Sequence, residues 1–300
     1  GGLIALAWAA AIGLAGFAIL ATLCHDAAHG ALLPSRSFNR WVLAFGFGVF
    51  GVSGALWGWR HVHLHHVYSN VAGTDIDGEG SALVRLGAHR PWRWWYRFQP
   101  VYAPLLYTLV VMQLAWQEDL RYRRMAIDHG ASTFASRRAT FEFVAVKLAH
   151  LSVFLVIPAL VLQPPPWGLL LGYWIATGIA SLLFILLAAG THLSTEAEFV
   201  VPEHGRIDHD WATHQLLTAV DWAPENALAV AVSGGANAHA AHHLFPQAAH
   251  SHNAELSRIV DHCAAKAGVA HHVTSFAGMV KAHLRHLAEM GRPPGDPAAA

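Results

Sequence analysis

Charged residues are scarce in this chain. Asp, Glu, Lys and Arg together account for 13% of its 300 residues, hydrophobic residues account for 54%, and the mean hydropathy is +0.35. An ordinary soluble domain carries about 25% charged residues. The formal net charge is zero, so the basic surplus that marks many nucleic-acid-binding proteins is missing. The composition therefore indicates a membrane protein and gives no sign of a nucleic-acid partner.

Cysteine is nearly absent as well, since Cys24 and Cys263 are the two copies. Two thiols permit at most one disulfide, and Cys24 lies in an apolar segment directly before a histidine. We therefore expect two free thiols that face a reducing compartment. An initiator Met and a basic amino-terminal region are also missing. We expect the sequence to begin inside the native protein and to carry no signal peptide.

Long apolar runs are plentiful by contrast. Residues 3–24, 143–162 and 167–190 are almost wholly apolar and long enough to cross a hydrocarbon core of about 30 Å. Residues 41–57 and 101–116 form two shorter apolar runs. The first three runs are predicted to be transmembrane spans. Whether the other two cross the membrane depends on the topology of the chain.

The arginines between residues 119 and 142 place that loop in the cytoplasm under the positive-inside rule. The following two spans are joined by a short uncharged turn, so residues 191 onward return to the cytoplasm. Histidines that share a site must lie on one side of the membrane. We therefore predict that residues 41–57 and 101–116 are re-entrant or interfacial, with the active site on the cytoplasmic face.

Histidine is the residue in excess, with 23 copies against 19 of Lys and Arg together. Neutral imidazole is the commonest metal-ligating side chain and suits iron, copper, nickel and zinc. Three clusters place histidines four residues apart or side by side, as on one face of a helix. They contain His25 and His29, then His61, His65 and His66, and finally His239, His242 and His243. Eight imidazoles exceed the need of one ordinary site, so the clusters predict a two-metal site.

Several residues close to the clusters are candidates for related roles. His192 follows the last span and is a possible ninth ligand. Polar side chains near the ligands could orient imidazoles by accepting their second N–H, but they could equally form an acidic surface. The candidates for this orienting role are Asp26, Asn70, Asp75, Asp77 and His214. The other histidines of the carboxyl-terminal region are interpreted as surface residues, namely His250, His252, His262, His271, His272, His283 and His286.

These expectations define a fold class, an all-α integral membrane protein. Residues 1–290 are predicted to form a single domain, in which a transmembrane helical stem carries a cytosolic helical cap, residues 191–290, that holds the histidine-rich dimetal site. Residues 291–300 are Pro-rich and are predicted to be a disordered tail.

The three clusters resemble the histidine boxes of the membrane-bound fatty acid desaturases and hydroxylases. His25-Asp26-Ala27-Ala28-His29 resembles the first box, HxxxH, and His61-Val62-His63-Leu64-His65-His66 resembles the second, HxxxHH. His239-Ala240-Ala241-His242-His243-Leu244-Phe245-Pro246 resembles the third, HxxHHLFP. Three boxes in this order, between about residues 20 and 260, are far more specific than any one of them.

The resemblance implies an O2-dependent fatty acyl desaturase with two non-haem Fe ions. It carries the ligand role to the eight box histidines, and to His192 as the extra histidine outside the boxes, while His63 has no counterpart. The substrate would be a fatty acyl chain on CoA, acyl carrier protein or lipid, or a free acid. No haem-binding His-Pro-Gly-Gly motif is present, so an external electron donor, a ferredoxin, rubredoxin or cytochrome, is implied. Front-end desaturases usually carry Gln where this chain has His239, so the double-bond position does not carry over.

Three related reactions and one different class of protein remain as alternatives. The same boxes serve fatty acid hydroxylases, acetylenases and oxidative decarboxylases that form terminal alkenes. A histidine-rich metal transporter would place its ligands in the middle of the membrane on opposed helices. Here every cluster lies at the end of an apolar run or beyond it, which favours the oxidase.

Overall fold

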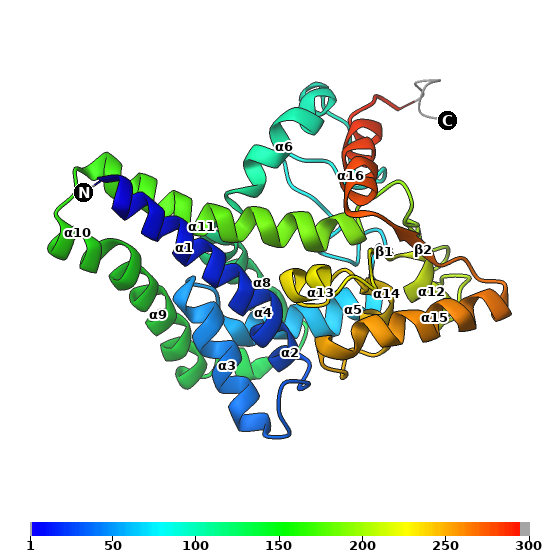
Figure 1. Ribbon diagram of the computed structural model, residues 1–300, viewed down its shortest axis with the longest axis horizontal. Helices are drawn as coiled ribbons and strands as arrows, with labels where there is room; N and C mark the ends of the chain where they lie inside the picture. The colour runs from blue at the N-terminus through cyan, green and yellow to red at the C-terminus, as the bar shows by residue number, and fades with distance from the viewer. Residues whose placement is uncertain (1, 295–300) are drawn as a thin grey trace. The chain divides into compact units, whose positions relative to one another are not determined.

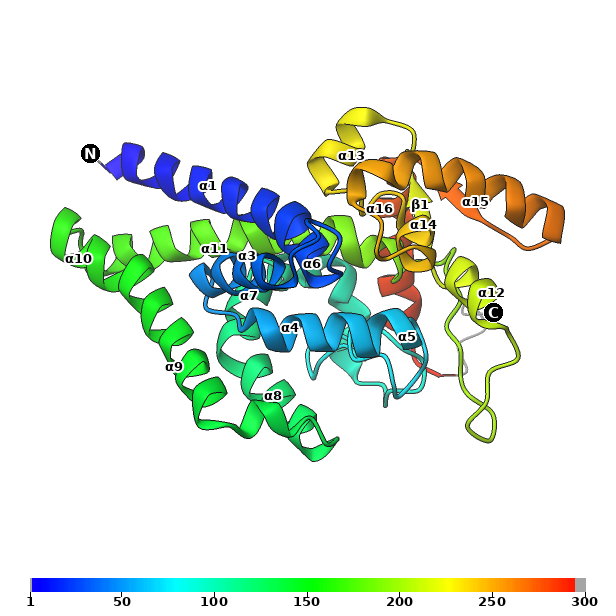
Figure 2. The same cartoon turned by 90° about the horizontal axis from the view of Figure 1, so that it is seen from below.

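The computed structural model describes residues 2–294 and is predominantly helical (Figures 1 and 2). The chain divides into two compact units. Unit 1 contains residues 2–60 and 106–184, and unit 2 contains residues 61–105 and 185–294. The helical class is confirmed.

Unit 1 contains most of the long apolar helices. Within residues 2–294, three helices are long and apolar enough to cross a membrane, Gly2–Ala28, Arg137–Leu162 and Pro166–Thr191. The last of them extends past the boundary of the unit. Each includes one of the predicted spans. The helices of unit 1 are α1 (Gly2–Ile19), η1 (Leu20–Cys24), α2 (His25–Ala28), α3 (Arg36–Val49), α4 (Gly54–Arg60), α7 (Val110–Gln113), η4 (Leu114–Glu118), α8 (Asp119–Asp128), η5 (Ser132–Ala135), α9 (Arg137–Leu151), η6 (Ser152–Val156), α10 (Ile157–Leu162) and α11 (Pro166–Ala188).

Glycine allows α1 to pack closely on α11, beside which it lies in both views (Figures 1 and 2). A Cβ at Gly13 would lie 2.7 Å from the carbonyl oxygen of Ala176 and 2.9 Å from Cβ of Ile179. No larger residue fits there without moving a backbone, a pattern typical of helices packed within a bilayer.

The chain between α3 and α4 turns sharply, and the buried Asp119 side chain pairs with residues at and beside the turn. Gly51 has φ of +76°, a conformation that favours glycine. The Asp119 carboxylate accepts hydrogen bonds from the Ser53 amide at 2.7 Å and from the Lys147 ammonium at 2.6 Å. Arg36–Val49 with Gly54–Tyr68, and Trp94–Tyr107 with Val110–Asp128, are each helix pairs bent by more than 40° at a short break. Their predicted re-entrant or interfacial position remains a prediction.

Unit 2 combines short helices with a small sheet. Strand β1 (Val220–Trp222) pairs in parallel with β2 (His272–Thr274), with Asp221 opposite Val273. The all-α prediction missed this sheet, because two strands of three residues leave too short a pattern to detect. The helices are η2 (His61–His65), α5 (His66–Tyr68), η3 (Trp94–Phe98), α6 (Gln99–Tyr107), η7 (Ala189–Thr191), α12 (Trp211–Leu217), α13 (Ala227–Ser233), α14 (His239–Leu244), η8 (His250–His252), α15 (Asn253–Ala267) and α16 (Phe276–Met290).

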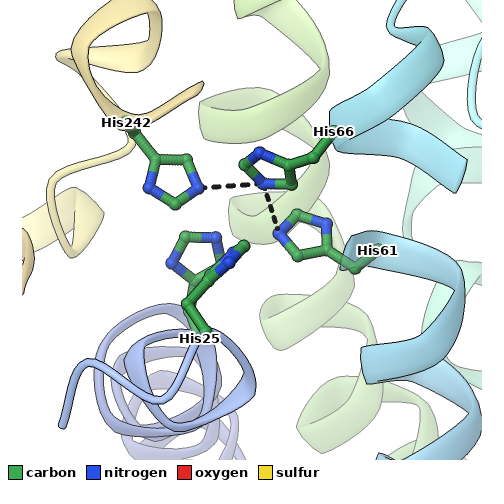
Figure 3. A group of neighbouring side chains, drawn as sticks. His25, His61, His66 and His242 are labelled. Carbon is green, nitrogen blue, oxygen red and sulfur yellow. Dashed lines mark hydrogen bonds between the residues drawn. The ribbon is translucent and has the colours of Figure 1, made fainter. Parts of the chain in front are cut away.

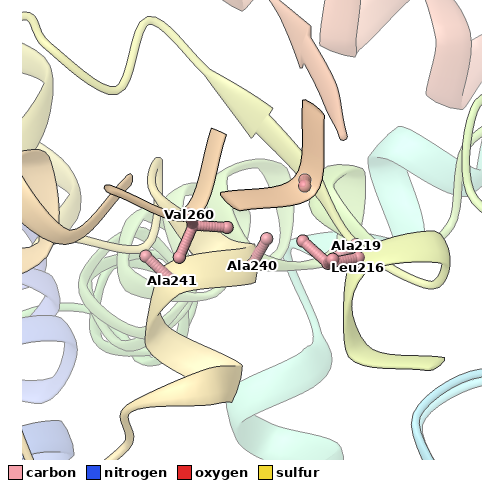
Figure 4. Packing of buried hydrophobic residues seen from close by; sticks show 6 residues of the cluster. Leu216, Ala219, Ala240, Ala241 and Val260 are labelled. Atoms are coloured by element: carbon pink, nitrogen blue, oxygen red, sulfur yellow. The ribbon is translucent and has the colours of Figure 1, made fainter. Parts of the chain in front are cut away.

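A small apolar core holds α14 against its neighbours. Ala240 and Ala241 of α14 are fully buried and pack with Leu216 of α12 and with Val260 and Ala264 of α15 (Figure 4). Methyl side chains let the helix approach both partners closely. The same helix carries the third histidine cluster.

Two histidines that were predicted to lie on the surface are buried, and a third has a largely covered side chain. The side chain of His271 is 2% exposed, and His283 and His286 are 3% and 2% exposed. His283 pairs with the Leu193 carbonyl and His286 with the Leu86 carbonyl. His283 and His286 lie on α16, and His271 pairs with Asp221 of β1 and Asp261 of α15. These contacts join distant segments, so no local pattern reveals them.

Two smaller predictions concern the cysteines and the carboxyl-terminal tail. Cys24 and Cys263 are free, as expected. Of the predicted disordered tail, residues 295–300 lie outside the described residues. Gly291, by contrast, accepts a hydrogen bond from the Trp92 indole at 2.9 Å.

Candidate metal centre

The second histidine cluster lies on the helix that runs from Gly54 to Tyr68. His61 and His65 bound the π-helical turn η2, and His66 begins α5. The wider turn changes the usual helical spacing, and π-helical turns of this kind often occur at functional sites. All three side chains are buried, whereas the neighbouring His63 is exposed.

The third cluster and His192 come from distant parts of unit 2. His239, His242 and His243 lie on α14, and His192 follows η7. All four are buried, with His243 only 1% exposed. Burial of so many imidazoles in a small core is costly unless they are paired or bind a ligand.

One group of four histidines converges within unit 2. His65, His192, His239 and His243 each offer one ring nitrogen, and these atoms all lie within 4.8 Å of one another. Nε2 of His192 lies 2.7 Å from Nε2 of His239 and 3.1 Å from Nε2 of His243. Residues more than a hundred positions apart therefore aim their nitrogens at one point.

A second group lies directly beside the first. Nε2 of His66 lies 3.1 Å from Nε2 of His61 and 3.1 Å from Nε2 of His242 (Figure 3). The rings of His66 and His243 stack with their centroids 4.2 Å apart, which joins the two groups. Seven histidines of unit 2 thus form two adjacent sets of nitrogen donors.

The hydrogen bonds at the far side of the rings show that a cation fits the first group. Nδ1 of His192 donates to the Thr218 carbonyl at 2.8 Å, and Nδ1 of His243 donates to Oε1 of Gln215 at 2.8 Å. In a neutral imidazole the other nitrogen then carries a lone pair. Two lone pairs 3.1 Å apart repel each other, and a bound metal ion would convert that repulsion into coordination.

The electrostatics keep these imidazoles neutral. Burial, followed by the charge of His65, lowers the pKa of His192 from 6.5 to about 3. Burial, followed by the charges of His66 and His192, lowers the pKa of His243 well below its usual value. Only the unprotonated ring binds a metal, so both residues are ready to act as ligands at neutral pH.

The acidic loop after the second cluster packs behind His65. Nδ1 of His65 lies 3.4 Å from Oδ1 of Asp75 and 3.5 Å from Oδ2 of Asp77. Asp75 is 2% exposed and also accepts the Asn70 amide at 2.8 Å. His65, Asp75 and Asp77 are by themselves close enough together to hold a cation. Because Nδ1 of His65 faces the carboxylates, Nε2 stays available to the four-histidine group.

Asn70 connects this loop to His192. Its Nδ2 donates to the carbonyl of His192 at 2.9 Å and to that of Glu198 at 3.0 Å. Its φ is +55°, a conformation that Asn tolerates better than most residues. Asn70 therefore supports the backbone of a candidate ligand, His192, through its side-chain amide.

Gln215 and Thr218 support ligands and were not predicted individually. Gln215 belongs to the polar stretch 208–215 that drew attention to His214, so the sequence signal was present but did not single out Gln215. His214 itself is buried, and burial lowers its pKa. Among the described residues, no hydrogen bond joins its ring to a converging histidine.

The first cluster lies in unit 1. His25 and His29 follow η1, and their rings meet edge to face with centroids 5.1 Å apart. Asp26 between them is 4% exposed. The pair keeps the HxxxH arrangement on one helix face, and its part in the metal centre stays a prediction.

The comparison with known proteins is consistent across nearly the whole chain. Residues 2–275 match the family model for fatty acid desaturase. The chain is 30% identical over 273 residues to the sn-1 linoleoyl-lipid 6-desaturase of Arthrospira platensis, covering 89% of this chain and 72% of that protein. It is 30% identical over 296 residues to the protein of the same name from Synechocystis sp., covering 94% and 79%. The acyl-lipid (8-3)-desaturase of Physcomitrium patens is 26% identical over 89% of this chain, which spans 56% of that protein.

Proposed function

Because this chain belongs to the fatty acid desaturase family and is thus an oxidoreductase, we propose that it uses O2 and two non-haem irons to introduce a double bond into an acyl chain. The observation that carries the proposal is the pair of adjacent nitrogen-donor groups in unit 2. Two such groups match the chemistry, since imidazole is a good ligand for iron and a two-metal centre needs two sets of donors.

The proposed ligands are nine histidines. Seven come from unit 2, with His65, His192, His239 and His243 in one group and His61, His66 and His242 in the other. His25 and His29 of unit 1 are retained as ligands because of their spacing and their place in the first box. Asp75, Asp77 and Asn70 would orient or support ligands through the hydrogen bonds described above.

When bound, the iron pair would supply with O2 an oxidant that can break an unactivated C–H bond, which side-chain acid–base chemistry cannot do. The protein holds the metals through neutral, buried imidazoles. Thr218 and Gln215 fix the tautomers of His192 and His243 by accepting their Nδ1–H. Burial of the seven side chains also excludes bulk water from the metals.

The substrate is proposed to be an acyl chain esterified to a lipid. The two relatives with the highest identity given above are named for linoleoyl-lipid, and the third for acyl-lipid. Three long apolar helices support an integral membrane location, in which a lipid substrate is at hand. We place the active site on the cytoplasmic face and assign electron supply to a ferredoxin, rubredoxin or cytochrome partner.

The decisive experiment compares lipid products of cells that express the chain with a ferredoxin system. The test variant is His65→Ala, and the control is His63→Ala, an exposed histidine on the same π-helical turn. A new internal double bond in acyl lipids with wild type and His63→Ala, but not with His65→Ala, supports the proposal and gives the double-bond position.

Other products would show that the enzyme catalyses a different reaction from the one proposed. A hydroxylated chain, a triple bond, or an alkene one carbon shorter would keep the metal centre and identify a hydroxylase, acetylenase or decarboxylase. Stoichiometric zinc or manganese without any acyl product would favour a metal transporter instead.

A further inference from the structure

Helix α14, which carries His239, His242 and His243, has no N-cap side chain of its own that accepts a hydrogen bond. Helix α14 has six residues, and its N-cap position is Ala238, whose methyl group cannot accept a hydrogen bond. A helix of this length has negligible stability by itself in water. Contacts from elsewhere in unit 2 must therefore set its position.

Asp221 provides the missing cap from the neighbouring strand. Its side chain is fully buried, and Oδ1 accepts the backbone N–H of Ala240 at 2.8 Å. Oδ2 accepts the Ser257 hydroxyl at 2.8 Å and Nε2–H of His271 at 3.1 Å. A carboxylate at the first turn of a helix satisfies an open N–H group and interacts favourably with the helix dipole.

The surroundings of Asp221 hold it in one place. Asp221 lies opposite Val273 in the sheet, and the amide of the next residue, Trp222, donates to the Asn237 carbonyl at 2.8 Å. Ala223 adopts φ of +44°, which a non-glycine residue keeps only where its neighbours determine it. Its carbonyl accepts Nδ2 of Asn237 at 3.1 Å.

His271 is the side chain that pairs with Asp221. Burial lowers the pKa of His271, but hydrogen bonds and charge from Asp221 and Asp261 outweigh it, so the pKa is raised. The Nδ1 of His271 pairs with Oδ1 of Asp261 at 3.3 Å. The Asp221 carboxylate thus has three hydrogen-bond donors, one of which is an imidazole that can carry positive charge.

We propose that Asp221 is a positioning residue of the metal centre, whose carboxylate fixes the register of α14 and thereby the point at which His239, His242 and His243 present Nε2. The inference rests on the proposed function in one respect, since it takes these histidines as metal ligands. The hydrogen bonds of the Asp221 side chain go to the Ala240 amide, the Ser257 hydroxyl and the His271 ring, so its link to α14 runs through the helix backbone.

The test is a cobalt(II) titration of the purified full chain in detergent, followed by the visible absorption of bound Co²⁺. The variant is Asp221→Asn, which keeps the size of the side chain. Its amide cannot accept hydrogen bonds from all three donors. The control is Asp261→Asn, which alters the opposite, 67% exposed partner of His271.

We expect Asp221→Asn to weaken cobalt binding about 10- to 100-fold and to change the absorption band, as loss of an outer support of a metal site does. Asp261→Asn should leave both within about twofold, because exposed ion pairs contribute little. An unchanged affinity and spectrum in folded Asp221→Asn would overturn the proposal.

If Asp221→Asn does not fold, Ser257→Ala decides, since it removes one donor to the same carboxylate. The expected loss of affinity is about 2- to 10-fold, the equivalent of one hydrogen bond, and no loss would overturn the proposal. Wild-type protein that binds no cobalt would overturn it together with the metal centre. If Asp221→Asn binds cobalt more weakly but the wild type forms no desaturated product, the positioning role of Asp221 is supported and the proposed desaturation is rejected.

Discussion

Two helices deliver six of the proposed ligands, and they are held in different ways. The helix Gly54–Tyr68 is long, and its three ligands follow one another within six residues. Helix α14 has six residues in all and depends on Asp221, Gln215 and an alanine-lined core from other elements. The position of a ligand on a long helix is fixed mainly by the hydrogen bonds of that helix. The position of a ligand on a short helix is fixed mainly by contacts with neighbouring elements. The two halves of the site should therefore respond differently to changes away from the metals.

Removal of a ligand from either helix should have the largest effect and should not distinguish the two. We expect His66→Ala and His243→Ala each to abolish product formation and to lower iron occupancy, because each leaves a metal without a buried donor. Metal analysis and lipid product analysis measure both effects. His262→Ala on α15 is the control, since that histidine is exposed. Full activity in either ligand variant would remove that residue from the centre.

Loss of a supporting side chain should affect the ligands of the two helices to different extents. Gln215→Leu removes the acceptor for Nδ1 of His243, and we expect iron affinity or activity to fall about 10- to 100-fold. Asp75→Asn weakens a longer contact, 3.4 Å, to His65 on the long helix, so its effect should be smaller. Parallel iron titrations of the two variants test the order. A larger loss for Asp75→Asn would contradict the comparison.

Overpacking beneath the short helix should disturb the site from a distance. Ala241→Leu adds volume at a fully buried position between α14 and its partners, with an expected cost of about 1–3 kcal/mol in unfolding free energy. Metal affinity should fall with it, because α14 must shift to make room. The matched control is Ala265→Leu, an exposed position on α15. Thermal unfolding and iron content of both variants provide the measurement, and equal behaviour would argue against the close packing of α14.

The smallest expected effect is a pH dependence of stability at His271. Its pKa in the folded protein is raised above the usual 6.5 by Asp221 and Asp261, although burial acts in the opposite direction. The stabilisation is complete below pH 6.5 and is lost as the pH rises through the folded pKa. The melting temperature of His271→Gln should therefore fall below that of wild type most at acidic pH, and the gap should narrow as pH rises. A gap that widens with pH would show that His271 is not the charged partner.

The parts of the site that could be predicted are those with local patterns. Spacings of three and four residues pointed to six of the seven histidines that converge in unit 2, and the seventh, His192, was singled out by its position after the last span. The acidic loop, which was expected either to orient ligands or to form a surface, lies beside His65. The supporting contacts of Gln215, Thr218 and Asp221 could not be predicted, because each joins residues at least nineteen positions apart. His271 was misplaced on the surface for the same reason.

The sequence by itself determined the family, the helical class and the identity of the candidate ligands, because apolar run length and histidine spacing are local properties that survive without any knowledge of the fold. The tertiary structure alone decided how those ligands are grouped, which tautomers they adopt and which buried residues hold α14. Those features depend on contacts between distant segments, whose energy comes from burial and hydrogen bonding that no local pattern of residues records.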